Sequence, residues 1–191
     1  MIVEGFACRY KHTAAGARQI VAYLVPGDFA DTHVFVLNAM DHSIGALSAC
    51  RVVAIPRATI LELLERPAIA KAMWLATLVD EGVLREWIVN IGARNAKERI
   101  AHLMCELLAR VKAVGLATGD SFELPITQSE LGETMGLSPV HVNRTLKLLR
   151  ADGLIAFKGR QLVILDAARL RAISSFNSGY LHLEERDQPV R

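Results

Sequence analysis

The stretch Thr127–Gly153, with the sequence TQSELGETMGLSPVHVNRTLKLLRADG, contains the start and stop signals of two short helices. Thr127 can cap the first helix, and Glu130 follows three residues later to complete a capping box. Gly136 stands where the chain would leave this helix through a left-handed residue. A second helix begins only a few residues further on, so the stretch predicts a helix–turn–helix.

The second helix is expected to run from Pro139 to about Ala151, because Ser138 is a good N-cap and proline suits the first helical position. A rotation of about 100° per residue places apolar side chains on one face and polar or basic side chains on the opposite face. The expected inner face consists of Val142, Thr145, Leu146 and Leu149. The expected outer face and its flanks consist of Val140, His141, Asn143, Arg144, Lys147 and Ala151.

The residue types on the outer face are those that read and hold DNA. Arginine can pair with the guanine edge and asparagine with the adenine edge, whereas lysine suits phosphate. The alternative is an ordinary amphipathic helix with a solvated basic face. Local charge favours DNA, because residues 138–160 contain five basic side chains and one acidic side chain, although the whole chain carries a net charge of only +2.

The sequence after the second helix predicts a β-hairpin. Residues 154–157 and 161–165 have the pattern of two strands around Lys158-Gly159-Arg160. Such a wing would place two cations at its tip, where they could contact backbone phosphate. A short strand is expected at 122–126, and Asp166 is expected to cap a final helix that ends near Phe176.

The first 57 residues have the pattern of short strands and turns. Strands are expected within 2–10, over 18–24 and over 46–55, with turns at 15–17 and 26–28. This spacing predicts a small β-barrel or jelly roll.

The pattern becomes helical from Thr59. A short helix is expected at 59–65, a long one at 68–90, a hinge at 91–95 and another helix at 96–114. The long helix has two apolar seams, Ile69, Ala72, Ala76, Val79 and Val83 in one and Met73, Leu84, Trp87 and Ile91 in the other. One seam could cover the β-domain, and the other predicts pairing with the same helix of another copy. The alternative is a single buried helix in a monomer.

Composition narrows the function classes. Cys8, Cys50 and Cys105 lack metal-binding or redox spacing, and neither a signal peptide nor a membrane-spanning run is evident. A cytoplasmic protein with no membrane partner and no cofactor is therefore expected. No paired carboxylates, nucleophile–base set or phosphate loop indicates an enzyme. The rival to a DNA reader is a small-molecule-binding β-roll whose helical domain is an interaction module.

The order of these elements resembles the Crp/Fnr family of bacterial transcription regulators. The motifs that carry the resemblance are TQSELG at 127–132, GLS at 136–138, VNRTLKLL at 142–149 and DGLI at 152–155. The resemblance implies an α+β fold, with a partial β-roll like a cyclic nucleotide-binding domain, a long dimerisation helix and a winged helix–turn–helix. The expected boundaries are 1–66 for the β-roll, 67–92 for the dimerisation helix and hinge, 93–176 for the DNA-binding domain and 177–191 for a flexible tail.

Specific residues match the family's DNA-binding positions. Arg144 matches the family's base-reading arginine, Ser138 matches the Ser or Thr that opens the recognition helix, and Thr127 and Gln128 match phosphate-contacting positions. The full expected DNA-binding set is Thr127, Gln128, Ser138, Pro139, Val140, His141, Asn143, Arg144, Lys147, Lys158 and Arg160. The family often has Glu where this chain has Val140 and Arg where it has Pro139, so the half-site should differ. Val140 is either a contact for a thymine methyl group or a neutral surface position.

The sensor half departs further from the family. Residues 2–5 resemble a middle strand of the β-roll, so either the start is misplaced or the sensor is shortened. Residues 26–29 match the turn before the family's ligand cassette, but no arginine lies between Arg18 and Arg51 to neutralise a cyclic phosphate. Cyclic nucleotide binding is therefore not expected. Asp28, Asp31, His33, Asp41 and His42 indicate either a metal or pH sensor or simply polar loop residues.

The sequence thus predicts a regulator that binds double-stranded DNA as a homodimer through the 67–91 helix. Its two recognition helices would enter successive major grooves of a near-palindromic operator. RNA polymerase and an unidentified small-molecule effector remain open as further partners. A regulator that no longer senses any effector is the remaining alternative.

Overall fold

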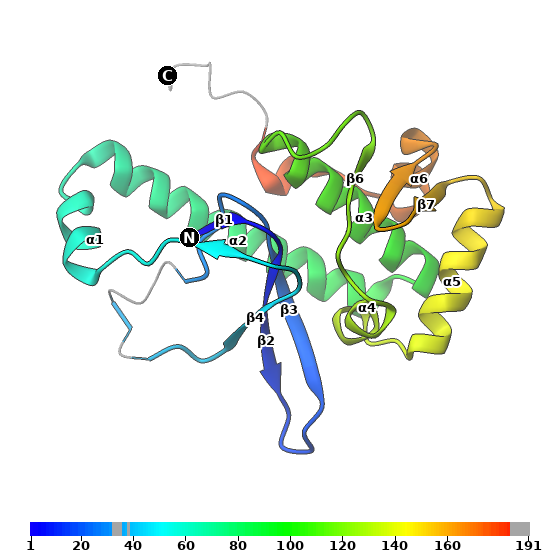
Figure 1. Ribbon diagram of the computed structural model, residues 1–191, viewed down its shortest axis with the longest axis horizontal. Coiled ribbons are helices and arrows are strands. Elements are labelled where there is room, and N and C mark those ends of the chain that lie inside the picture. The colour runs from blue at the N-terminus through cyan, green and yellow to red at the C-terminus, as the bar shows by residue number, and fades with distance from the viewer. Residues whose placement is uncertain (32–35, 38, 184–191) are drawn as a thin grey trace.

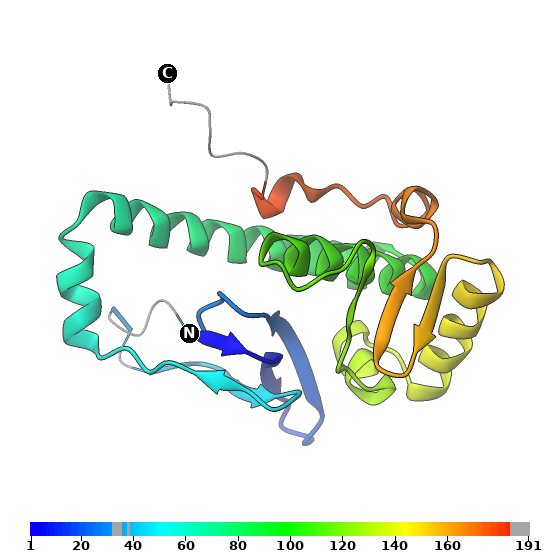
Figure 2. The same cartoon turned by 45° about the horizontal axis from the view of Figure 1, so that its top comes forward.

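The computed structural model describes residues 1–31, 36–37 and 39–183. A lobe of β-strands and a winged-helix lobe are joined by long helices (Figure 1). Helix α2 (Pro67–Ala93, 27 residues) lies along the strands, and α3 (Ala96–Ala113) continues into the winged-helix lobe (Figure 2). This arrangement agrees with the α+β fold expected from the sequence.

The β-lobe contains two small antiparallel sheets. Its strands are β1 (Ile2–Glu4), β2 (Ala7–His12), β3 (Arg18–Leu24), β4 (Ser43–Ala46) and β5 (Arg51–Val52). One sheet has the order β1-β5 and the other β3-β2-β4. The break between β1 and β2 requires glycine, since Gly5 has a φ of +84° and an added Cβ would lie 2.1 Å from the Ala49 oxygen.

The prediction of one continuous strand over 46–55 is wrong. β4 ends at Ala46 and β5 contains only two residues. The carbonyl oxygen of Phe6 accepts hydrogen bonds from the backbone N–H groups of Leu47 and Ser48, at 2.8 and 3.2 Å, and so turns the chain between the two strands. The turns expected at 15–17 and 26–28 and the strand expected over 18–24 are confirmed.

The helical region follows the prediction with one adjustment. α1 (Arg57–Leu64) is short, and α2 continues to Ala93, so the expected hinge at 91–95 narrows to Arg94 and Asn95. Asn95 begins α3 with a capping box, in which its side chain accepts from the N–H groups of Lys97 and Glu98. This cap allows the chain to start a new helix immediately after the break.

The winged-helix lobe agrees closely with expectation. Its elements are β6 (Ser121–Glu123), α4 (Gln128–Met135), α5 (Pro139–Ala151), β7 (Ile155–Lys158), β8 (Gln161–Ile164) and α6 (Ala167–Ser174). The sheet has the order β6-β8-β7 and is antiparallel. It packs on α3, the central helix of the lobe.

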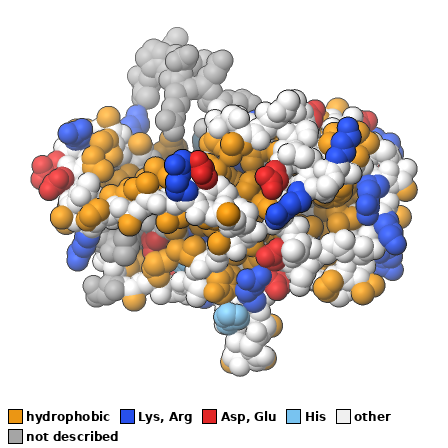
Figure 3. Space-filling model, viewed as in Figure 1, with side chains coloured by type: hydrophobic (Ala, Val, Ile, Leu, Met, Phe, Trp, Pro, Cys, Tyr) orange, Lys and Arg blue, Asp and Glu red, His pale blue; other side chains and the backbone are white. Residues whose placement is uncertain are grey.

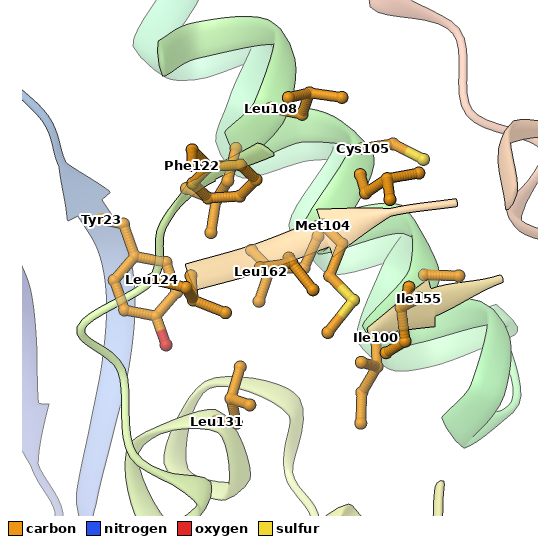
Figure 4. Close-up of a cluster of buried hydrophobic side chains, with 14 of the residues drawn as sticks. Tyr23, Ile100, Met104, Cys105, Leu108, Phe122, Leu124, Leu131, Ile155 and Leu162 are labelled. Atoms are coloured by element: carbon orange, nitrogen blue, oxygen red, sulfur yellow. The ribbon is translucent and has the colours of Figure 1, made fainter. Parts of the chain in front are cut away.

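A single hydrophobic core connects the two lobes. Ile100 and Met104 of α3 lie among side chains from the wing and from α4, including Leu162 and Leu131 (Figure 4). Tyr23 of β3 enters the same cluster from the β-lobe and is fully buried. The β-lobe and the DNA-binding lobe are therefore packed on each other.

The seam of Met73, Leu84, Trp87 and Ile91 on α2 is not exposed along its whole length. Trp87 is only 4 % exposed, because its ring packs edge-on against Tyr23 and its N–H donates to Glu106. The large apolar side chains that α2 does expose are Trp74, Leu78, Leu84, Ile88, Val89 and Ile91. Hydrophobic side chains gather over α1 and the neighbouring part of α2 on the face shown in Figure 3.

The tail expected from residue 177 begins with ordered structure. Residues Ser178–Leu181 form the short 3₁₀-helix η1, in which Leu181 is buried and the Tyr180 hydroxyl donates to Glu106 at 2.7 Å. The expectation of a flexible tail is therefore wrong for η1, and residues 184–191 lie outside the described residues. No helix within the described part combines the length and apolarity needed to cross a membrane.

Candidate nucleic-acid interface

Two caps and two glycines set the geometry of the helix–turn–helix. The Thr127 hydroxyl accepts from the Glu130 N–H at 3.2 Å, and the Glu130 carboxylate accepts from the Thr127 N–H at 2.7 Å. Gly136 leaves α4 with a φ of +64°. Gly132 lies against the turn, since an added Cβ would be 2.4 Å from the Leu137 oxygen. These features bring α4 and α5 close together.

The recognition helix α5 has one buried and one exposed face, as predicted. Val142, Thr145, Leu146 and Leu149 are at most 4 % exposed. Ser138 begins the helix by accepting the His141 N–H at 3.2 Å. Val140, Arg144 and Lys147 lie on the exposed face. Within the described residues, neither Arg144 nor Lys147 has an ion pair or a hydrogen-bonded side-chain partner, so both cations are free to meet a ligand.

The flank of this face holds a pair of side-chain amides. The Asn143 amide donates to the Gln128 oxygen at 3.0 Å, which links α5 to the first turn of α4. His141 is half-buried on the other flank. The Gln128 N–H₂ group and the Asn143 carbonyl oxygen are not used in this link. The sequence did not predict this link, because it depends on the crossing of the two helices.

The wing places its two predicted cations in the open. Lys158 and Arg160 are exposed on either side of Gly159, whose φ of +62° makes the tight turn. The Arg160 Nε lies 3.8 Å from a Glu123 carboxylate oxygen, with both side chains more than half exposed. Such an exposed ion pair is weak, so Arg160 can leave Glu123 and bind another anion.

A groove of about 360 Å³ separates the wing from the start of α4. Its lining includes Thr127, Gln128, Arg150, Phe157 and Arg160. The Arg150 guanidinium lies 6.0 Å from the centre of the Phe157 ring. Arg150 was counted in the local charge excess but was absent from the predicted site, because the groove depends on the position of the wing.

The pocket between the β-lobe and α2 has a different character. Arg9 is already occupied, donating to the carbonyl oxygens of Phe29 and Ala30 at 2.8 Å and to Asp80 at 2.9 Å. A cavity of about 230 Å³ beside it is lined by Asp31, Asp41, His42, Asp80 and Glu81, among others. Hydrogen bonds from His42 and Lys11 lower the pKa of Asp41 to about 2, so this lining is anionic.

Three of the residues considered for metal binding, Asp31, Asp41 and His42, line this cavity, but their side chains do not form a metal-binding arrangement. Asp28 pairs with Arg110 at 2.6 Å, whereas Asp41 pairs with Lys11 and His42 at 2.9 Å. His33 lies outside the described residues. Among the residues that are described, no group of three or more His, Cys, Asp or Glu side chains has a metal-binding arrangement.

Comparisons with known proteins agree with this architecture. The model of a Crp-like helix-turn-helix domain matches residues 98–173, and that of a cyclic nucleotide-binding domain matches residues 1–67. The transcriptional activator protein FnrL of Cereibacter sphaeroides is 29% identical over 174 residues, covering 88% of this chain and 69% of the relative. The nitrogen fixation regulation protein FixK of Bradyrhizobium diazoefficiens is 29% identical over 179 residues, covering 91% of this chain and 73% of that protein.

A solved structure gives the same result. FixK2 from Bradyrhizobium japonicum superposes with a TM-score of 0.75 at 25% sequence identity, covering 91% of this chain and 85% of that one. The match therefore includes the β-lobe, the long helix and the winged helix together. The chain belongs to the Crp/Fnr family of DNA-binding transcription regulators.

Proposed function

We propose that the chain acts as a homodimer on a near-palindromic operator, with one α5 helix in each half-site. The observation that carries this proposal is the exposed edge of α5, where Arg144 and Lys147 lack partners among the described residues while the opposite face is fully buried. A recognition helix that is held from behind and basic in front suits the major groove. A merely solvated basic helix would not need the close approach of Gly132 to the turn at Leu137.

The proposed dimer forms through the helix at 67–91. Its support is the apolar surface that α2 exposes, in which Trp74 is 68 %, Leu78 51 % and Ile88 72 % exposed. These positions recur along one side of the helix, which suits pairing with a second copy. Residues 1–66 then act as the sensor domain, 67–92 as the dimerisation helix and hinge, and 93–176 as the DNA-binding domain.

The proposed contacts follow the exposure and chemistry of each side chain. Arg144 reads a base, with guanine as the preferred partner. Lys147, Lys158 and Arg160 hold phosphate, as do the helix–turn–helix starts at Thr127, Gln128 and Ser138. Pro139, Val140, His141 and Asn143 form the rest of the surface that faces the groove.

Control of this regulator is proposed to involve RNA polymerase and an effector other than a cyclic nucleotide. The acidic lining beside Arg9 opposes an anionic phosphate, and Arg9 itself is engaged by three oxygen atoms. The protein is proposed to work in the cytoplasm and to have no catalytic activity of its own.

Selection of bound duplexes from a random pool, with and without cell extract, tests this function. The selected half-sites should be inverted repeats, and binding should weaken steeply with salt. Arg144→Ala should reduce binding by about 1–3 kcal/mol and relax preference at one position. Lys158→Ala should weaken all duplexes alike and reduce the salt slope by about 1. Operator binding by Arg144→Ala as tight as that of the unmodified protein would show that the base reader is misassigned.

A further inference from the structure

The first turn of α5 presents an apolar surface where a recognition helix ordinarily meets bases. The Ser138 hydroxyl oxygen is engaged as the cap of the helix, accepting the His141 N–H. Pro139 has neither an N–H group nor a polar side chain. Val140 follows on the exposed face. The N-terminal residues of a recognition helix are those that approach the base edges, so Pro139 and Val140 offer the bases apolar contact and no hydrogen bond from their side chains.

Val140 stands out among the exposed side chains. It is 80 % exposed, more than any other large apolar side chain of the described residues. It lies four residues before Arg144, so the two share one face of the helix and are neighbours along it. A ligand that covers Arg144 from this face will therefore also cover Val140.

The chemistry of the major groove restricts what Val140 can recognise. Base edges there present hydrogen-bond donors and acceptors, and the thymine 5-methyl group is their apolar feature. Placing an aliphatic side chain over a donor or acceptor would leave that group without a partner, which is unfavourable. Contact with a methyl group instead removes two apolar surfaces from water.

We propose that Val140 determines specificity by contacting the 5-methyl group of a thymine in each half-site. This inference rests on the proposed function. Four helical residues rise about 6 Å, whereas successive base pairs are about 3.4 Å apart. The thymine should therefore lie within about two base pairs of the guanine that Arg144 reads.

The test uses the full chain and its selected duplex, with each thymine of the half-site replaced in turn by uracil. This change removes the methyl group and leaves base pairing intact. Replacement at one position, within about two base pairs of the Arg144-dependent guanine, should weaken binding about fourfold per half-site. Val140→Ala, whose side chain is two methyl groups smaller, should discriminate less between the thymine and uracil duplexes at that position. Its thermal unfolding midpoint should match that of the unmodified protein, because the side chain is exposed.

Lys147→Ala provides the matched control on the same face. It should weaken binding to both duplexes yet keep the full thymine preference. A thymine preference that is undiminished in Val140→Ala, or is absent from the unmodified protein, would overturn the inference while leaving DNA binding established. Failure of the unmodified protein to select any duplex would instead overturn the proposed function.

Discussion

His102 is a buried imidazole in the joint between α2 and α3. It is 1 % exposed, packs against the rings of Phe176 and Tyr180, and has no hydrogen bond on either ring nitrogen. Its Nε2 lies 3.4 Å from a Glu86 carboxylate oxygen, within ion-pair distance but without hydrogen-bond geometry. Burial, together with the nearby Arg94, lowers the pKa of His102 to about 4. The folded protein therefore favours the neutral ring.

This shift predicts a pH dependence of stability. Between pH 6.5 and 4 the unfolded chain binds a proton that the folded chain excludes, so stability falls as the pH is lowered through this window. The loss should approach about 3 kcal/mol. Chemical unfolding of the unmodified protein and of His102→Phe at several pH values measures it. An unchanged pH dependence in His102→Phe would refute the assignment.

Tyr180 supports a second buried group in the same joint. Its hydroxyl donates to Glu106, a fully buried carboxylate that also accepts from the Trp87 N–H at 3.1 Å. Burial raises the pKa of Glu106, although Arg110 at 3.6 Å opposes that shift. Each donor to this carboxylate therefore matters to the fold.

Tyr180→Phe should lower the free energy of unfolding by about 1–3 kcal/mol, because it leaves Glu106 with one donor fewer. Urea unfolding measures this loss. Tyr10→Phe is the matched control, since the Tyr10 hydroxyl has no hydrogen bond within the described residues. Equal stability losses for the two variants would mean that the hydrogen bond from Tyr180 to Glu106 does not contribute to the free energy of unfolding.

At the scale of elements, the close approach of Gly132 to Leu137 sets the crossing of α4 and α5. Gly132→Ala would force the turn outward and move α5 away from its seat on the core. The free energy of unfolding should fall by about 1–3 kcal/mol, and operator affinity should fall with it. Fluorescence anisotropy with a labelled operator and thermal unfolding report the two effects.

Gly119→Ala separates these effects from general backbone strain. Gly119, unlike Gly132, has a positive φ, +58°, and an added Cβ there would meet nothing within 4 Å, so its substitution strains the backbone without a steric clash. This variant should lose some stability and keep its operator affinity. Normal DNA binding by Gly132→Ala would show that the approach of the two helices is not what positions α5.

Local signals made the helix–turn–helix predictable. The caps at Thr127 and Ser138 and the left-handed Gly136 act within a few residues, and the structure places them as expected. The prediction of a strand over 46–55 was wrong because the deciding contact is long-range. The backbone of Phe6 turns the chain there from more than forty positions away. The sequence could not predict the burial of Trp87 in α2 for the same reason, since only the fold shows that Trp87 faces Tyr23.

At the scale of the molecule, the exposed side of α2 is the proposed dimer interface. Ile88→Glu should place a charge in the proposed interface and yield a particle of 20.9 kDa instead of one twice as heavy. Loss of the second recognition helix should weaken operator binding by about 10²–10⁴-fold. Sedimentation equilibrium and anisotropy measure these changes.

Val114→Glu is the control for this prediction, because Val114 is 42 % exposed at the C-cap of α3 and is not part of the exposed apolar side of α2. It should remain a dimer and bind DNA normally. A dimer that persists in Ile88→Glu would place the interface elsewhere on the molecule.

The sequence could predict the order and type of the lobes but not their mutual packing. Tyr23 shares a hydrogen bond of 2.5 Å with Thr134 of α4, and Arg18 pairs with Glu133 at 2.7 Å. No pattern along the chain reports such contacts between strands and a helix more than a hundred residues apart. The groove beside Arg150 and the amide link from Asn143 to Gln128 were unpredictable for the same reason.

The position of η1 has a consequence for how the protein is made. Tyr180 is synthesised 74 residues after Glu106, a delay of roughly 4–15 s on the ribosome. Late in that interval α2 and α3 are complete, yet Glu106 still lacks the Tyr180 donor and one side of His102 is uncovered. A chain that is released early would carry a complete reading helix on an unfinished joint. Cellular proteases would recognise such a product by its exposed joint and remove it before it could occupy an operator.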